Sequence, residues 1–214
     1  VGHINAQIIQ HQSLVHEEDL IVSGNDTRTI EDCEYDLIGN VEVKDNATLI
    51  IRNAVFNQTG RDVPVNITVK NSASLFLTNA TLRILQKTTS RIFVGNEAKM
   101  YIANSNIENT EYDISIWAED SSKIHIENSV MKRAREDIKG WIVQASTVVC
   151  DDNSEVEVKN LTLDRVTVYG NSEVFIERAT LRDAVRIFGD PTVQVSDSTV
   201  GYVTADGNSL VYIR

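Results

Sequence analysis

Carboxylates are the side chains of this sequence best suited to acid–base chemistry, and two groups of them lie close together along the chain. Such groups cleave acidic polysaccharides when two carboxylates converge on one bond, or when they hold Ca2+ beside a basic side chain. Neither group recurs at the same position of neighbouring segments, as a substrate groove would require. We therefore predict no catalytic residues, no metal site and no cofactor. The groups are Asp151, Asp152 and Glu155 with Arg165, and Asp113 with Glu111 and Glu119.

Histidine chemistry is not favoured either. His3, His11 and His16 lie near the start of the chain, and His125 stands alone between Ile124 and Ile126. In an alternating strand His125 points outward, and we interpret it as a surface residue.

The two cysteines, Cys33 and Cys150, are separated by four of the repeats described below. At ~4.8 Å per stacked strand they lie roughly 19 Å apart, whereas bonded cysteines need Cα atoms within about 7 Å. They cannot pair within one chain. In an oxidising compartment we expect an intermolecular disulfide, and in a reducing one they are small core residues.

Acceptor motifs for N-linked sugars, Asn-x-Ser/Thr, begin at six positions. We predict glycosylation at Asn25, Asn46, Asn57 and Asn66, with Asn57 and Asn66 the best sites because they flank a loop. Asn79 and Asn160 also begin such motifs, but we expect them to face inward and to stay unmodified.

These residues sit in a recurring pattern that consists of an alternating strand, a polar turn, a second alternating strand and an Asn, Asp or Arg. The closing residues are separated by 26, 25, 24, 32, 18 and 19 residues. Regular repetition indicates a solenoid, and strict alternation buries one face of each strand. Gly, Asn and Asp in the turns tolerate the positive φ angles of tight corners. We predict an all-β right-handed parallel β-helix of about eight coils. The closing residues are Asn53, Asn79, Asn104, Asn128, Asn160, Arg178 and Asp197.

The closing asparagines fall two positions after an inward-facing residue, so we predict that they also point inward. Stacked amides can satisfy buried corner groups that otherwise cost ~1 to 3 kcal/mol each. An internal ladder of Asn53, Asn79, Asn104, Asn128 and Asn160 is therefore expected; the alternative is that they are ordinary exposed turn residues.

Length and composition allow one domain. The chain has 214 residues, a net charge of -11, two prolines and 42% hydrophobic residues. Its acidity disfavours nucleic acid as a partner, and no apolar run is long enough to insert in a membrane. We assign residues 28–214 to the β-helix and 1–27 to an N-terminal segment, which either caps its own helix or is an arm exchanged with a neighbour. Between the coils, 128–141 has helical spacing and predicts a short helix.

Two surfaces suggest self-association. The sequence ends in the strand pattern Val211–Arg214, and an uncovered strand edge recruits another chain. One outward row is also more apolar than a free surface needs, which favours lateral packing on another subunit over sugar binding. That row contains Ile50, Phe76, Tyr101, His125, Glu157, Phe175, Gln194 and Tyr212.

The repeat Asn-Val-Glu-Val-Lys-Asp-Asn-Ala-Thr-Leu-Ile-Ile-Arg-Asn-Ala, residues 40–54, resembles the secreted right-handed β-helix proteins of archaeal cell surfaces. That group includes proteins proposed to build S-layers and methanogen sheaths. The resemblance covers residues 28–214 and rests on the order of strands, turns and closing residues in each repeat. No catalytic motif contributes to it. It implies an extracellular, N-glycosylated, structural protein at the cell surface or in the cell wall.

From the sequence we therefore expect a non-catalytic extracellular protein that polymerises end to end and laterally into a sheath, S-layer or fibre. The expected partners are copies of itself and N-linked glycans. A carbohydrate-binding module or a polysaccharide-degrading enzyme is the alternative.

Overall fold

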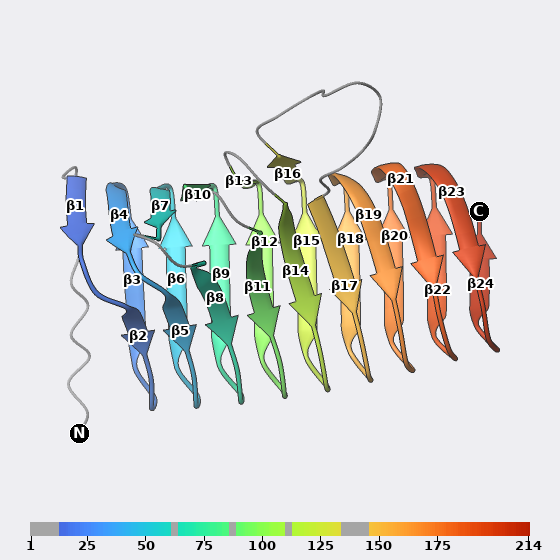
Figure 1. The fold of residues 1–214 in the computed structure, drawn as a ribbon, viewed down its shortest axis with the longest axis horizontal. Helices are drawn as coiled ribbons and strands as arrows, with labels where there is room; N and C mark the ends of the chain where they lie inside the picture. Colours follow the sequence, from blue (N-terminus) through green and yellow to red (C-terminus); the bar gives the residue numbers. More distant parts are fainter. Residues whose placement is uncertain (1–12, 61–63, 86–88, 110–112, 134–145) are drawn as a thin grey trace.

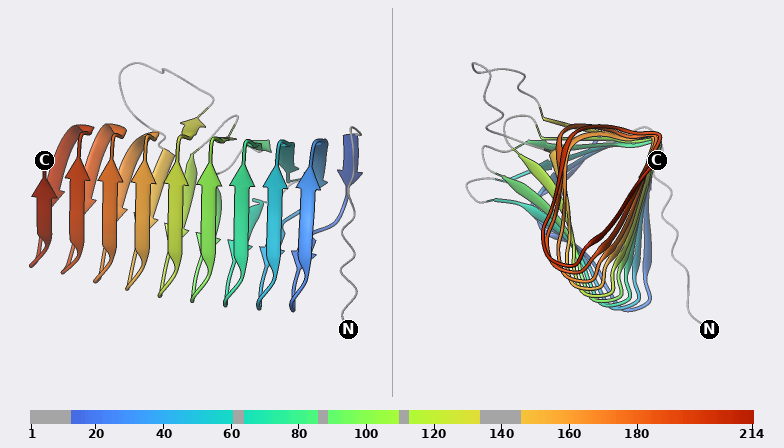
Figure 2. Two further views of the ribbon diagram at one scale, coloured as in Figure 1. Left: turned by 180° about the vertical axis from the view of Figure 1, so that it is seen from behind. Right: turned by 90° about the vertical axis from the view of Figure 1, so that its right-hand side faces the viewer.

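The structure, a computed structural model, describes residues 13–60, 64–85, 89–109, 113–133 and 146–214. In this part of the chain all regular elements are β-strands, and every paired strand runs parallel to its neighbours. Successive coils stack into a straight rod (Figure 1) with a roughly triangular cross-section (Figure 2). The predicted parallel β-helix is confirmed.

One wall of the rod is a nine-stranded sheet, which we call the front sheet. It takes one strand from each coil, in chain order. These strands are β3 (Thr27–Glu31), β6 (Thr48–Arg52), β9 (Ser74–Thr78), β12 (Lys99–Ala103), β15 (Lys123–Glu127), β18 (Glu155–Lys159), β20 (Glu173–Glu177), β22 (Thr192–Ser196) and β24 (Leu210–Ile213).

The other two walls belong to one fifteen-stranded sheet. The strands that precede the front sheet in each coil are β2 (Leu20–Val22), β5 (Val41–Val43), β8 (Asn66–Val69), β11 (Ser90–Val94), β14 (Ile114–Ala118) and β17 (Ser146–Cys150). Those that follow it are β4 (Glu34–Ile38), β7 (Val55–Thr59), β10 (Thr81–Leu85), β13 (Asn106–Asn109) and β16 (Val130–Arg133), and β1 (Ser13–His16) joins this wall by pairing with β4. In the last coils single bent strands cover both walls: β19 (Thr162–Val168), β21 (Thr180–Ile187) and β23 (Thr199–Ala205).

The bent strands explain why the last coils need only 18 or 19 residues. Between Leu181 and Ala184, β21 has one residue more than its neighbours β19 and β23, and the register of both pairings shifts there. A bulge of this kind turns a strand through a corner without a loop. Asp164, in β19, lies opposite the bulge and is almost fully buried, accepting hydrogen bonds from the backbone NH and the hydroxyl of Ser146 at 2.8 and 3.1 Å.

The core follows the predicted alternation. In β6, Leu49 and Ile51 are buried while Ile50 lies on the outside, and the same pattern repeats in the next strands of the front sheet. At the turns before these strands, Asp45, Asn71 and Asn96 adopt φ values near 60°. Asn and Asp tolerate this left-handed conformation, so the predicted turn chemistry fits its positions.

The closing asparagines form a ladder, but it lies outside the rod and corrects the prediction of an internal one. Asn53, Asn79, Asn104, Asn128 and Asn160 all adopt φ values of 47–50° and are exposed. A left-handed residue interrupts the two-residue alternation, so the chain places two successive residues outside and the next one inside. Ala54, Ala80 and Leu161, which follow three of them, are accordingly buried.

The corners still join neighbouring coils. Backbone NH groups of the closing residues bond to the next coil, as from Asn79 to Ala103 O at 3.0 Å. Side-chain amides add Asn79 Nδ2 to Asn53 Oδ1 at 3.3 Å and Asn160 Nδ2 to Asn128 Oδ1 at 2.8 Å. The pairs Asn53–Asn79 and Asn128–Asn160 thus bond through their amides, but all five asparagines are exposed turn residues, which was the alternative to the predicted internal ladder.

Two boundaries also differ from the prediction. Strands β1 and β2 pair in parallel with β4 and β5, so the β-helix already includes residues 13–22 rather than beginning at 28. The predicted helix over 128–141 is wrong at its start, because Val130–Arg133 is strand β16 paired with β13. Residues 1–12 and 134–145 lie outside the described part of the chain.

Candidate functional site

The outer face of the front sheet carries three rows of side chains, because the registers of its strands align residue by residue. We name the rows leading, central and trailing, in chain direction along each strand. From β6 to β24 the leading row is Thr48, Ser74, Lys99, Lys123, Glu155, Glu173, Thr192 and Leu210. The central row is Ile50, Phe76, Tyr101, His125, Glu157, Phe175, Gln194 and Tyr212, as predicted.

Aromatic rings of the central row stack on one another along the rod. Tyr101 and His125 are nearly parallel, with ring centroids 4.9 Å apart and planes 8° apart. Phe76 and Tyr101 lie 6.3 Å apart with tilted planes. Sugar-binding aromatics offer an open ring face to the ligand, whereas the faces of Tyr101 and His125 already cover each other. The stacked pair of Tyr101 and His125 therefore offers no free ring face between its two members.

A hydrogen-bonded polar cluster surrounds His125. Its Nδ1 lies 2.6 Å from Glu157 Oε2, and its Nε2 lies 3.6 Å from Glu127 Oε2. The Tyr101 hydroxyl donates to Glu127, and the Lys159 ammonium bonds Glu157. These donors hold the pKa of both carboxyls below the ordinary value, with Tyr101 the largest influence on Glu127 and Lys159 the largest on Glu157. The two carboxylates thus stay ionised and are engaged in joining coils, which makes them poor proton donors.

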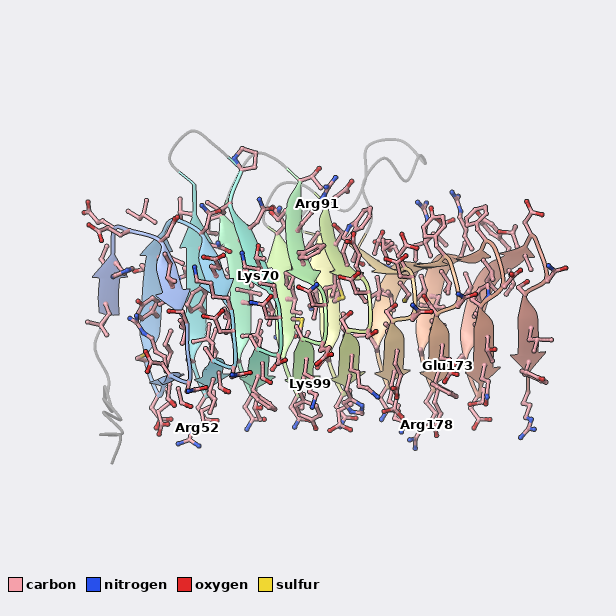
Figure 3. The ribbon with its side chains drawn as sticks, turned by 90° about the horizontal axis from the view of Figure 1, so that it is seen from below. Arg52, Lys70, Arg91, Lys99, Glu173 and Arg178 are labelled. Atoms are coloured by element: carbon pink, nitrogen blue, oxygen red, sulfur yellow. The ribbon has the colours of Figure 1, made fainter. Side chains whose placement is uncertain are left out.

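The leading row has a simple charge order. Two lysines, Lys99 and Lys123, occupy successive coils, and two glutamates, Glu155 and Glu173, occupy the next two. Lys123 and Glu155 form an ion pair where the signs meet. Lys99 and Glu173 lie on the same face (Figure 3) and are exposed.

Of the acidic groups singled out from the sequence, Glu119 of one group comes close to Asp151 and Asp152 of the other, and Glu111 lies outside the described residues. Arg165 pairs with Asp183. Glu119 lies beside Asp120, Asp151 and Asp152, which we call the turn aspartates. Burial, and then the charges of the turn aspartates, raise the pKa of Glu119. Among the described residues, no group of three or more His, Cys, Asp or Glu side chains could hold a metal ion.

Predicted sugar sites differ widely in accessibility. Asn25 and Asn46 are exposed in adjacent turns, where Asn46 Nδ2 donates to Asn25 Oδ1 at 3.2 Å. Asn66 is half-buried in β8. Asn57 is only 6% exposed, so the structure contradicts its prediction as one of the best sites. Asn57 lies under the acidic side chains of β4, which bind its amide.

Both cysteines are buried, Cys150 completely, and neither is in a disulfide. Burial raises the pKa of each thiol, so little reactive thiolate forms. Cys33 occupies the small inward position taken by Ala54 in the next coil, and Cys150 faces the core at the end of β17. The predicted intermolecular disulfide does not fit the structure at Cys150, which is fully buried, whereas Cys33 is 9% exposed and its pairing with another chain stays a prediction.

No protein-family model, no curated protein and no solved structure matches this chain. Within the described residues, no helix is long and apolar enough to cross a membrane.

The sequence identified the central row but missed two features of the front sheet. One is the polar cluster of His125, Glu127, Glu157 and Lys159. The other is the charge order of the leading row, which lies two residues before the central row in every strand and could have been found with the same alignment.

Proposed function

We propose that this chain is a non-catalytic, extracellular structural rod whose front sheets pair face to face with those of other copies. The resemblance to archaeal cell-surface β-helix proteins favours a sheath, S-layer or fibre as the setting. The single observation that carries the proposal is that the front sheet is complementary to itself. The end-to-end contact expected from the sequence remains a prediction.

The complementarity follows from a two-fold axis that lies in the sheet surface, runs along the strands and passes between β15 and β18. Rotation about this axis places the front sheet of a second rod against the front sheet of the first, with the two rods running in opposite directions. Each row of one copy then faces the same row of the other copy in reverse order. Lys99 then faces Glu173 of the second copy, and Lys123 faces its Glu155. An interface with this symmetry is isologous, and each contact occurs twice.

The same two-fold axis also brings the central and trailing rows of the two copies together. In the central row Ile50 meets Tyr212, Tyr101 meets Phe175 and His125 meets the Glu157 carboxylate, while Phe76 meets the amide of Gln194. The trailing row is Arg52, Thr78, Ala103, Glu127, Lys159, Glu177 and Ser196, continued by Arg214. In this row Glu127 meets Lys159, and Ala103 meets Glu177. Arg52 faces Arg214 at the outer ends, where Arg52 already pairs with Glu31.

The size of the contact sets its strength. Eight strands of about five residues each give a footprint of about 38 Å by about 16 Å, or roughly 600 Å2 of each copy. A standard stable interface takes about 800 Å2 from each partner. We therefore expect weak, concentration-dependent pairing, suited to an assembly built from many contacts.

Carbohydrate binding and polysaccharide cleavage by the same face are less well supported. The stacked rings of Tyr101 and His125 cover each other's faces, and Glu127 and Glu157 are held ionised by their donors.

The test uses two charge variants of the leading row. Lys99→Glu with Lys123→Glu makes the row acidic, and Glu155→Lys with Glu173→Lys makes it basic. Four exposed cross-pairs at ~0.2–1 kcal/mol each, about 0.8–4 kcal/mol in all, are lost in either variant, so self-association should weaken at least about fourfold. Sedimentation equilibrium should show each variant monomeric alone and a 1:1 mixture associating, with loss of the complex in high salt.

A matched control combines all four changes in one chain, which reverses every charge but preserves both the complementarity and the net charge. This variant should associate like the original chain. The proposal is contradicted if the original chain stays monomeric at millimolar concentration, or if the mixture associates no better than its components while both variants keep the original melting temperature.

A further inference from the structure

Asn79 and Asn160 present their acceptor motifs on the outside of one corner of the rod. Each has φ near 50° and is exposed, and the middle residue of each motif, Ala80 or Leu161, is buried. The motif threonines, Thr81 and Thr162, begin β10 and β19 and are half-exposed. The corner therefore displays the asparagine and the threonine together and hides the residue between them.

Each of the two asparagine side chains has one amide hydrogen that a sugar can replace. A side-chain amide has two N–H groups. Asn79 Nδ2 donates one to Asn53 Oδ1, and Asn160 Nδ2 donates one to Asn128 Oδ1. N-glycosylation removes one hydrogen, so the glycosylated amide keeps one N–H for the ladder.

Asn57 shows the opposite arrangement. Its Nδ2 donates to Glu34 Oε1 at 3.0 Å and to Asp36 Oδ1 at 2.7 Å, so both hydrogens are engaged. A sugar there would break a buried, charge-assisted hydrogen bond and displace its neighbours.

We propose that Asn79 and Asn160 are N-glycosylation sites of the folded chain and that Asn57 is not. This inference rests on the extracellular location in the proposed function. The amide nitrogen loses a proton and bonds to the anomeric carbon of a lipid diphosphate-linked oligosaccharide, whose C–O bond breaks as the lipid diphosphate leaves. The sites lie three coils apart, about 14 Å along one edge. Sugars at this edge leave the central row of the front sheet uncovered.

The experiment expresses the chain in a secretory eukaryotic host and maps sugars on the folded, secreted fraction. Peptide mass spectrometry after enzymatic deglycosylation in 18O water marks each former glycosylation site. Asn79 and Asn160 should be occupied and Asn57 unoccupied. Thr81→Ala and Thr162→Ala, which keep the asparagines, should each remove one glycan step on a gel.

A gain-of-site variant tests the corner itself. Asn104 occupies the same ladder between Asn79 and Asn128 but lacks the motif, because Asn106 stands where Thr is needed. Asn106→Thr should add one glycan at Asn104. Unmodified Asn79 and Asn160 in folded protein, an occupied Asn57, or no gain from Asn106→Thr would overturn the inference.

These outcomes are independent of the assembly test. The host supplies an extracellular route whatever the native compartment is, so the sugar map can fail while front-sheet pairing holds, and the reverse.

Discussion

Arg178 offers a direct test of how the corners are built, because it is the one closing residue in the ladder that is neither Asn nor Asp. Its φ is 52°, and its ion pair is a 3.2 Å contact with the adjacent Glu177, with 55% of the Arg178 side chain exposed. The left-handed conformation costs an ordinary L-residue ~1–2 kcal/mol, and Asn tolerates it better. Arg178→Asn should therefore stabilise the chain.

Three contributions decide the expected gain in the free energy of unfolding. Relief of backbone strain contributes about 0.5–1 kcal/mol, and an exposed amide bond to Asn160 adds up to about 0.5 kcal/mol. Loss of the exposed ion pair costs about 0–0.5 kcal/mol. The net gain of about 0–1.5 kcal/mol, with a middle value of about 0.75 kcal/mol, corresponds to about 2–3 °C in melting temperature at that middle value for a chain of this size.

Calorimetry of three variants separates the terms. Arg178→Asn and Arg178→Gly should both melt above the original chain, since both accept positive φ. Arg178→Ala keeps the strain, loses the ion pair and should melt at or below it. If Arg178→Ala is as stable as Arg178→Asn, the left-handed corner is not what selects these residues.

Three further results are expected. Glu119→Gln should raise the melting temperature at pH 7, because burial and the turn aspartates disfavour the charged form of Glu119. The gain in melting temperature should fade as the pH drops towards the ordinary pKa of 4.5, and a gain that stays constant with pH would contradict this. Cys33 and Cys150 should resist a thiol reagent until guanidinium unfolds the chain, and fast labelling of native protein would show accessible sulfurs. Ile126→Ala, in the middle of the core, should cost ~2–5 kcal/mol in denaturant titration, and a loss below about 1 kcal/mol would mean that this site is loosely packed.

The fold was predictable because its two signals are local. Alternation such as Leu49, Ile50, Ile51 marks the buried face, and Asp45-Asn46 or Gly95-Asn96 marks the turn, without knowledge of distant contacts. The central row was predictable for the same reason, since matching the strands aligns their outward residues.

Errors arose where one residue changes the alternation or where a side chain must be placed in three dimensions. Asn79 was assigned inward because the left-handed φ that breaks the period is a property of the corner. The burial of Asn57 depends on Glu34 and Asp36, which reach it from the preceding coil. The helical spacing that starts at Val130 was overridden by parallel pairing with β13, a tertiary contact.

Solution X-ray scattering over a range of protein concentrations tests the central claim most directly, since it reports the shape of what forms. Front-sheet pairing predicts that the cross-section of the particle roughly doubles while its maximum length hardly changes, and that Lys99→Glu with Lys123→Glu abolishes the increase. A length that doubles at constant cross-section, or a particle that stays a single rod at millimolar concentration, would contradict it.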